Sequence, residues 1–145
     1  MFGCAFLLDE TTSSFIWLFK SFLESMGEKA PKTIITDQDQ VMSNAIKDVF
    51  PNTVHRLCLW HISKNAPSHL GGYNSNPEFC KFFYKCLQGC ETEVEFQKTW
   101  DKMMERFTGL VNYKWLTKLY DIRHKWCMAL SKDIFSGDIK SSQRS

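Results

Sequence analysis

Two short predicted strands flank an amphipathic segment in the first half of the chain. Residues 33–36 (Thr-Ile-Ile-Thr), which follow Pro31, are β-branched and have the composition of a buried strand, and residues 53–59 are predicted as a second strand after the turn at Pro51 and Asn52. Between them, apolar residues recur at helical spacing from Val41 to Val49, and Pro51 ends the pattern. The order strand, helix, strand is typical of an α/β layer.

A further strand and helix are predicted upstream of this unit. Residues 2–8 form an apolar run, and Thr11 or Thr12 can cap a helix that ends at Gly27. The apolar stripe of that helix consists of Phe15, Ile16, Leu18, Phe19, Phe22, Leu23 and Met26. We expect this helix to cover a sheet of roughly three strands, within an α/β core over residues 1–65.

The remainder of the chain is predicted to be all-α. Residues 66–76 are rich in Pro, Gly, Ser and Asn and are expected to form a loop. Helices are predicted over residues 77–88, over residues 92–107 and from Asn112 onward. The third holds an aromatic-rich stripe, which favours core packing over base stacking: Trp115, Leu116, Leu119, Ile122, Trp126 and Ala129. Residues 66–145 would thus be the helical part of a single domain spanning residues 1–145.

Composition fits one globular domain and excludes several functional classes. The 145 residues are 43% hydrophobic and 14% aromatic, enough for one sizeable core. The net charge is only +2 and the Lys and Arg residues are spread along the chain, so charge alone does not indicate nucleic-acid binding. No apolar run has the length of a membrane span, and the six scattered cysteines suit reduced thiols, so an intracellular protein without membrane partners is expected.

Asp37 is the first candidate for chemistry, because it follows the strand at residues 33–36. Ligands in α/β sheets gather at the carboxyl ends of strands. The alternative is a purely local role, since either Asp37 or Asp39 can cap the following helix.

Cys58 and His61 form a Cys-x-x-His at the end of the second predicted strand. A Cys and a His at this spacing can bind one zinc ion, but a structural zinc needs four ligands. Cys86 and Cys90, four residues apart, could complete such a site; buried Cys and His side chains that only pack in the core are the alternative.

The run TIITDQDQVMSNAIKDVFPNTVHRLCLWHISKN resembles the core of the Mutator-like element (MULE) transposase domain in the plant far-red-impaired-response and FAR1-related sequence family. The segments FGCAFLLDETTSSFIWLFKSFLESMGEKAPKTIITD and WLTKLYDIRHKWCMALSKDIFSGDIKSSQR extend the resemblance to nearly the whole chain. The resemblance implies a partial ribonuclease-H-like (DDE transposase) core followed by helices.

The same resemblance implies an Asp, Asp, Glu triad that binds two Mg²⁺ or Mn²⁺ ions, of which only Asp37, the middle aspartate, can be assigned. It places the first aspartate upstream of Met1 and the glutamate after Ser145; Asp9 and Glu10, in the loop before a helix, are poor substitutes. Two-metal phosphoryl transfer needs several carboxylates. We therefore expect no catalysis by this chain alone, and expect a fragment or a decayed copy.

For function, the resemblance implies a transposase-derived regulator of transcription in light signalling, located in the nucleus. It also implies zinc-binding segments on both sides of this region, DNA binding only in the full-length context, and homo- or heterodimers with related family members. Two alternatives stay open. The chain could be a piece of an active Mutator-like transposase whose flanks complete the metal site, or a zinc-stabilised module for protein interaction.

Overall fold

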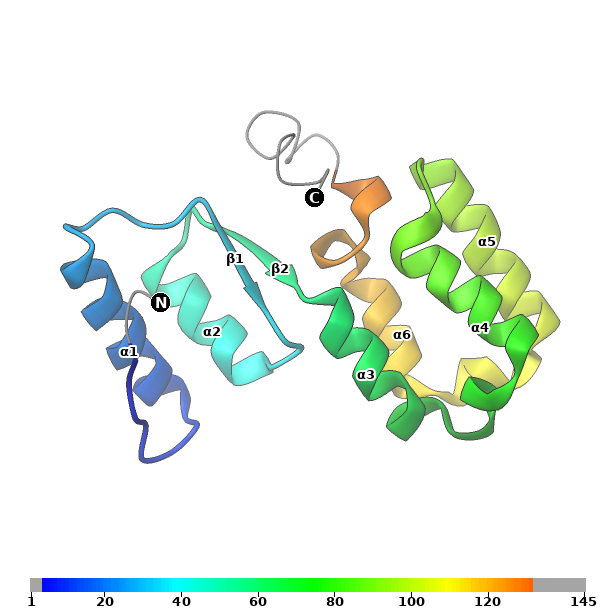
Figure 1. Cartoon of the computed structure of the whole chain (residues 1–145), viewed down its shortest axis with the longest axis horizontal. Helices are drawn as coiled ribbons and strands as arrows, with labels where there is room; N and C mark the ends of the chain where they lie inside the picture. The colour runs from blue at the N-terminus through cyan, green and yellow to red at the C-terminus, as the bar shows by residue number, and fades with distance from the viewer. Residues whose placement is uncertain (1–3, 132–145) are drawn as a thin grey trace. The chain divides into compact units, whose positions relative to one another are not determined.

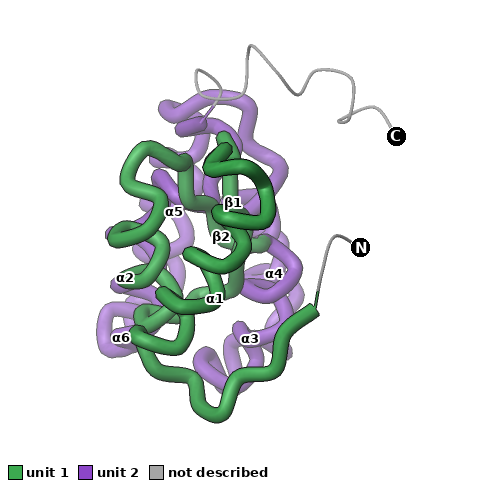
Figure 2. The backbone as a smooth tube through the Cα atoms, turned by 90° about the vertical axis from the view of Figure 1, so that its left-hand side faces the viewer, with its two compact units in different colours: residues 1–58 green, residues 59–145 purple. Residues whose placement is uncertain are grey.

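The computed structural model describes residues 4–131, and these residues belong to two compact units that divide between Cys58 and Leu59 (Figure 2). The first unit contains α1 (Thr12–Ser25), β1 (Thr33–Thr36), α2 (Gln40–Val49) and β2 (Val54–Leu57). The division lies close to the position where the sequence pattern changes from α/β to all-α.

The first unit is built on a parallel β1–α2–β2 crossover, as the sequence predicts (Figure 1). Thr33 pairs with Val54 and Thr36 with Leu57, and α2 supplies the long connection that parallel strands require. Helix α1 packs against α2, where the rings of Phe19 and Phe50 lie 5.7 Å apart. The fold is therefore α/β in this unit, with a small sheet.

Helix ends in this unit follow the predicted local chemistry. The Thr11 side chain accepts a hydrogen bond from the Ser14 N–H and caps α1. Gly27 follows the end of α1 with a φ of +66°, a conformation that glycine adopts without steric cost. The cap of α2 is Asp39, whose Oδ1 lies 2.9 Å from the Met42 nitrogen.

The strand predicted over residues 2–8 is wrong for residues 4–8, which form no strand; the first three residues lie outside the described part. Phe6 and Leu8 are fully exposed, so this apolar run has no partner to pack against. A strand needs a hydrogen-bonded neighbour, and residues 4–8 pair with neither β1 nor β2. The sheet consequently has two strands within the described residues rather than roughly three.

The second unit is helical, as predicted. It contains α3 (Leu59–Leu70), η1 (Gly71–Ser75), α4 (Pro77–Tyr84), the π-helical turn η2 (Lys85–Gly89), α5 (Glu93–Arg106), η3 (Thr108–Asn112), α6 (Lys114–Asp121), η4 (Arg123–Lys125) and η5 (Met128–Leu130). Within this unit α4 lies beside α5, and α3 lies beside α6 (Figure 1). These helices are short, so packing of their side chains against one another, rather than their length, stabilises them.

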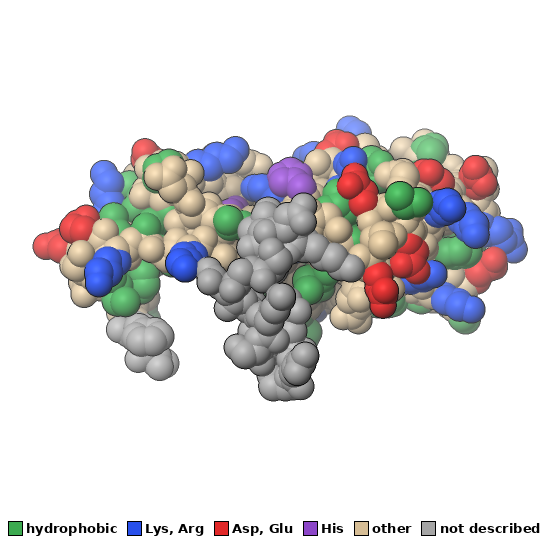
Figure 3. Space-filling model, turned by 90° about the horizontal axis from the view of Figure 1, so that it is seen from above, with side chains coloured by type: hydrophobic (Ala, Val, Ile, Leu, Met, Phe, Trp, Pro, Cys, Tyr) green, Lys and Arg blue, Asp and Glu red, His purple; other side chains and the backbone are tan. Residues whose placement is uncertain are grey.

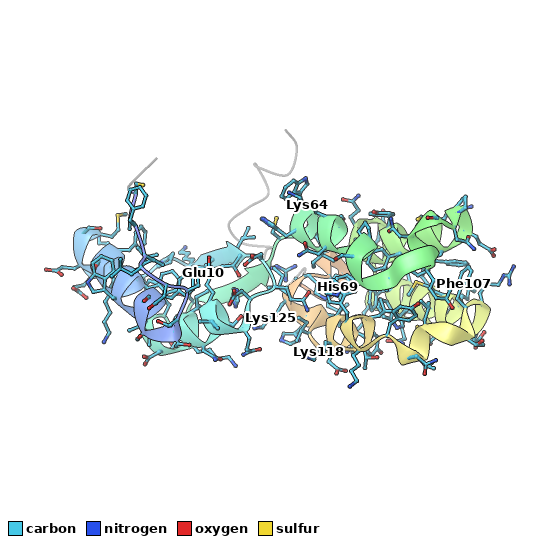
Figure 4. The ribbon with its side chains drawn as sticks, turned by 90° about the horizontal axis from the view of Figure 1, so that it is seen from below. Glu10, Lys64, His69, Phe107, Lys118 and Lys125 are labelled. Carbon is cyan, nitrogen blue, oxygen red and sulfur yellow. The ribbon has the colours of Figure 1, made fainter. Side chains whose placement is uncertain are left out.

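Aromatic side chains fill the core of the second unit. Trp126 is fully buried, and its indole Nε1 donates a hydrogen bond of 2.8 Å to the Leu119 carbonyl. The Phe96 ring packs edge-on against Trp126 with centroids 5.7 Å apart. Trp115 is half-buried and stacks on His69 at 4.9 Å, joining α6 to α3 (Figure 4). Both tryptophans pack within the unit, as their helical spacing predicted.

Two predicted boundaries in this unit are wrong. Residues 66–76 are not a loop, because α3 continues through Pro67 to Leu70 and is followed by η1. Proline inside a helix costs about 3 kcal/mol, and the complete burial of Ala66 and Leu70 on either side offsets it. The last predicted helix breaks after Asp121, so Trp126 lies in a turn rather than in a continuous helix.

The described surface shows no region of a single charge on the face in Figure 3, where Lys and Arg lie among Asp and Glu. This interspersion agrees with the net charge of +2. Within residues 4–131, no helix has both the length and the apolar character needed to span a bilayer.

We predict that Phe79→Ala lowers the free energy of unfolding of the second unit by about 3–5 kcal/mol, because the side chain is fully buried and leaves a cavity. Val94→Ala, on an exposed position of α5, should change it by less than about 0.5 kcal/mol. Urea unfolding followed by circular dichroism measures both variants. Equal effects of the two substitutions would contradict the assigned core.

Candidate functional site

Asp37 directly follows β1 and is half-buried. Its backbone carbonyl accepts two hydrogen bonds, from the Thr36 hydroxyl at 2.8 Å and from the Asp39 N–H at 3.0 Å. Its carboxylate has no hydrogen bond to any of the residues that the structure describes. The backbone of the turn is thus fixed while the carboxylate keeps its capacity to bind a ligand.

His55 supports this turn from the neighbouring strand. Its Nε2 lies 2.7 Å from the Thr36 hydroxyl oxygen. A threonine hydroxyl has one proton, and here that proton is donated to the Asp37 carbonyl, so Thr36 accepts from His55 and the Nε2 atom carries a hydrogen. His55 lies within the second predicted strand, but its contact with Thr36 depends on the register between β1 and β2, which the sequence pattern does not give.

Asp39 has a structural role: its carboxylate caps α2 and is therefore not a second unbonded carboxylate beside Asp37. Its Oδ1 accepts from the Met42 N–H, and its carbonyl accepts from the Ser43 N–H at 3.0 Å and hydroxyl at 2.8 Å. Of the two candidate caps, Asp39 caps α2 and Asp37 does not. This division leaves Asp37 as the one carboxylate at the exit of β1 available for ligand chemistry in the described part.

Cys58 lies beside Asp37 at the same edge of the sheet. Its N–H donates a 2.7 Å hydrogen bond to the Thr36 carbonyl, so the exits of β1 and β2 are adjacent. Mg²⁺ and Mn²⁺ prefer oxygen ligands, whereas a thiolate selects softer metals. An aspartate next to a cysteine therefore does not constitute the carboxylate set of a two-metal centre.

His61, the other half of the Cys-x-x-His, follows the second predicted strand in the sequence and is the third residue of α3 in the structure. It belongs to the second unit, while Cys58 closes the first. Its Nδ1 is buried without a hydrogen-bond partner, and its ring packs edge-on against Trp60 at 4.9 Å. The role of Cys58 and His61 as zinc ligands stays a prediction.

Cys86 and Cys90, the other proposed zinc ligands, are both buried in the second unit. Burial raises the pKa of the Cys86 thiol, and the nearby Cys90 and Cys127 raise it further. Zinc binds the thiolate, which this environment disfavours. Across residues 4–131, no group of three or more His, Cys, Asp or Glu side chains is arranged to hold a metal ion. Within the described residues, these cysteines therefore do not form an assembled metal site in this structure.

Asp9 also has a local role. It accepts hydrogen bonds from the Ser14 hydroxyl and from the hydroxyl and N–H of Thr11, and these bonds lower the pKa of its carboxyl. Asp9 therefore belongs to the network that starts α1, and it does not replace the first aspartate of a triad.

Comparisons with known proteins show which family the chain resembles. Residues 1–65 match the MULE transposase domain. Across its whole length the chain is 38% identical to "Protein FAR-RED IMPAIRED RESPONSE 1" and 36% identical to "Protein FAR1-RELATED SEQUENCE 5", both from Arabidopsis thaliana. It is 30% identical, again across its whole length, to "Protein FAR1-RELATED SEQUENCE 9" of the same plant. No solved structure matches the chain.

The resemblance found in the sequence is therefore confirmed: the chain is a homologue of the far-red-impaired-response and FAR1-related proteins, and its first part is similar to the MULE transposase domain. The chain spans 18% of the length of the first two of these relatives. What the rest of such a protein contributes lies outside these residues.

Replacing the two aspartates of the β1–α2 turn should separate their roles. We predict that Asp39→Ala destabilises the first unit by about 0.5–2 kcal/mol, because α2 loses its cap. Asp37→Ala should change the free energy of unfolding by less than about 0.5 kcal/mol, because it removes no side-chain hydrogen bond within residues 4–131. Denaturant unfolding of both variants tests this, and a larger loss for Asp37→Ala would assign that carboxylate a structural role.

The cysteines should react in the order of their exposure. We predict that Cys4, which is exposed, reacts with a thiol reagent at least about tenfold faster than Cys86, Cys90 and Cys127, which react only after the second unit opens. Alkylation at several times followed by mass spectrometry measures each site. Added Zn²⁺ should not change the rates at Cys86 and Cys90; specific protection of both by zinc would restore the zinc-site hypothesis.

Proposed function

We propose that this chain is a non-catalytic segment of a transposase-derived protein that regulates transcription in the plant nucleus. The observation that carries the proposal is that Asp37, at the end of β1, belongs to no group of metal-binding side chains within the described residues. Two-metal catalysis holds two cations about 4 Å apart between several carboxylates. A single aspartate next to a cysteine does not supply that set, so the turn would persist as scaffold.

The parallel sheet is, on this proposal, part of a ribonuclease-H-like core. Support comes from the β1–α2–β2 crossover, from Asp37 at the end of its first strand, and from the match of residues 1–65 to the MULE transposase domain. In such a core Asp37 would hold the position of the middle aspartate, and its partners would lie outside this chain.

DNA binding, nuclear location and pairing with related proteins would then belong to the full-length protein. The net charge of only +2 supports this assignment, and so do the interspersed charges on the face in Figure 3, which give that face no strong attraction for phosphate. The name of one relative, "Protein FAR-RED IMPAIRED RESPONSE 1", supports a role of the full-length protein in light signalling.

A plasmid-nicking assay tests the non-catalytic state. We predict that the purified chain, with Mg²⁺ or Mn²⁺, converts supercoiled DNA to nicked DNA no faster than Asp37→Ala does, and no faster than chain kept in EDTA. The physical reason is the missing carboxylate set. Metal-dependent nicking that disappears in Asp37→Ala would contradict the proposal and favour an active transposase fragment.

A further inference from the structure

Charged residues are distributed unevenly over the second unit. Helices α4 and α5, with the residues between them, hold six acidic and five basic residues. The ion pairs Lys85–Glu95 and Arg106–Glu78 both belong to this pair of helices. By contrast, α3, α6 and η4 together hold one acidic residue and five basic ones: Lys64, Lys114, Lys118, Arg123 and Lys125. The second unit therefore has a near-neutral part and a basic part.

The basic part is continuous in space, because α3 and α6 are in contact. His69 of α3 stacks on Trp115 of α6, with ring centroids 4.9 Å apart and ring planes 2° from parallel. Figure 4 shows the labelled Lys64, His69, Lys118 and Lys125 at the same end of the second unit. The exposed side chains of the two helices thus belong to one surface.

Two lysines of α6 are available to a partner. Lys114 and Lys118 are exposed and lie four residues apart, so they project from the same face of the helix. Neither forms an ion pair with any residue in the described part of the chain. On α3, the Lys64 ammonium lies over the ring of Trp60, 4.7 Å from its centroid.

Exposed apolar side chains accompany these lysines. Trp60 is 59% exposed, and Val111, three residues before Lys114, is 64% exposed. A partner that buries such side chains gains hydrophobic free energy that a purely charged ligand does not. We call the exposed side chains of these two helices and the turn before α6 the α3–α6 face: Trp60, Lys64, Val111, Lys114 and Lys118. This face favours a ligand that is both acidic and apolar.

A nucleic acid fits the α3–α6 face less well than an acidic peptide does. Binding to a phosphate chain depends on the number of phosphates that are neutralised, and the face has only three lysines. Bases also need open aromatic rings on which to stack. The Lys64 ammonium covers one side of the Trp60 ring, and His69 covers Trp115. An acidic peptide with apolar side chains uses both the lysines and the exposed apolar surface.

A second copy of the chain is also a less suitable occupant. The acidic segment it would offer is the start of α5, where Glu91, Glu93 and Glu95 surround the exposed Val94. That contact would join two different surfaces, so it would continue from copy to copy instead of closing into a dimer. A separate partner protein has no such constraint.

We propose that the α3–α6 face binds an acidic segment of a partner protein, whose Asp or Glu side chains pair with Lys114 and Lys118 and whose apolar side chains cover Val111 and Trp60. The charges select the partner and speed its association, and the apolar contacts supply most of the affinity. The face lies in the second unit and does not include Asp37. The proposal therefore goes beyond the non-catalytic role and does not depend on it.

Fluorescence anisotropy of a labelled peptide tests the charged contacts. The probe has about 16 residues, of which half are Asp or Glu and a quarter are Leu or Phe. Lys114→Glu combined with Lys118→Glu should weaken its binding to the chain at least about tenfold, because attraction becomes repulsion. Lys98→Glu combined with Lys102→Glu makes the same change at the same spacing on exposed positions of α5. This control should bind within about threefold of the unchanged chain.

A second matched pair tests the apolar contact. Val111→Ser should weaken probe binding at least about threefold, because the side chain no longer buries apolar surface against the peptide. Val94→Ser, at a position of α5 that is also 64% exposed, should leave the affinity unchanged. If circular dichroism shows that the double Glu variant is unfolded, Lys114→Gln combined with Lys118→Gln replaces it, with an expected loss of at least about threefold.

Four results would overturn the proposal. One is the absence of probe binding, and another is an equal loss in the α5 control, which would mean nonspecific attraction. Tighter binding of an oligothymidylate of the same length, lost in the double Glu variant, would assign the face to nucleic acid. Self-association in sedimentation experiments, lost in the same variant, would assign it to a second copy. The nicking assay reads a different property, so the two proposals fail independently.

Discussion

The parallel pairing of β1 with β2 is the constraint on which the first unit depends. Parallel strands need a long crossover, and α2 supplies it. That geometry places the carboxyl-terminal ends of both strands side by side, where the Cys58 N–H donates a hydrogen bond to the Thr36 carbonyl. Asp37 and Cys58 are neighbours because of this pairing. The candidate site is thus a consequence of the topology of the sheet.

Hydrogen bonds fix the backbone of the turn after β1, although no group of metal-binding side chains surrounds it within residues 4–131. His55 donates to Thr36, Thr36 donates to the Asp37 carbonyl, and Asp39 caps the next helix. Each of these bonds stabilises the fold without involving the Asp37 carboxylate. The bonds that fix this backbone are therefore independent of any ligand at the Asp37 carboxylate.

Local signals predicted the parts of the fold that are determined locally. The strand at residues 33–36, the apolar spacing of α2 and the helix predicted over residues 92–107, which is α5, are all found where the sequence placed them. The errors have non-local causes: residues 4–8 lack a strand neighbour, and burial of Ala66 and Leu70 carries α3 through Pro67. At the site, Asp37 was predicted, but the link from His55 through Thr36 depends on strand register, which the sequence does not specify.

The most direct test of the central claim, that Asp37 stands alone, is paramagnetic broadening by Mn²⁺ in the NMR spectrum of the ¹⁵N-labelled chain. The account predicts weak broadening spread over exposed carboxylates, with no preference for the turn after β1 and no change in pattern in Asp37→Asn. Broadening concentrated on Asp37 and its neighbours at micromolar Mn²⁺, and lost in Asp37→Asn, would contradict it. That result would mean that further ligands from this chain complete a metal site.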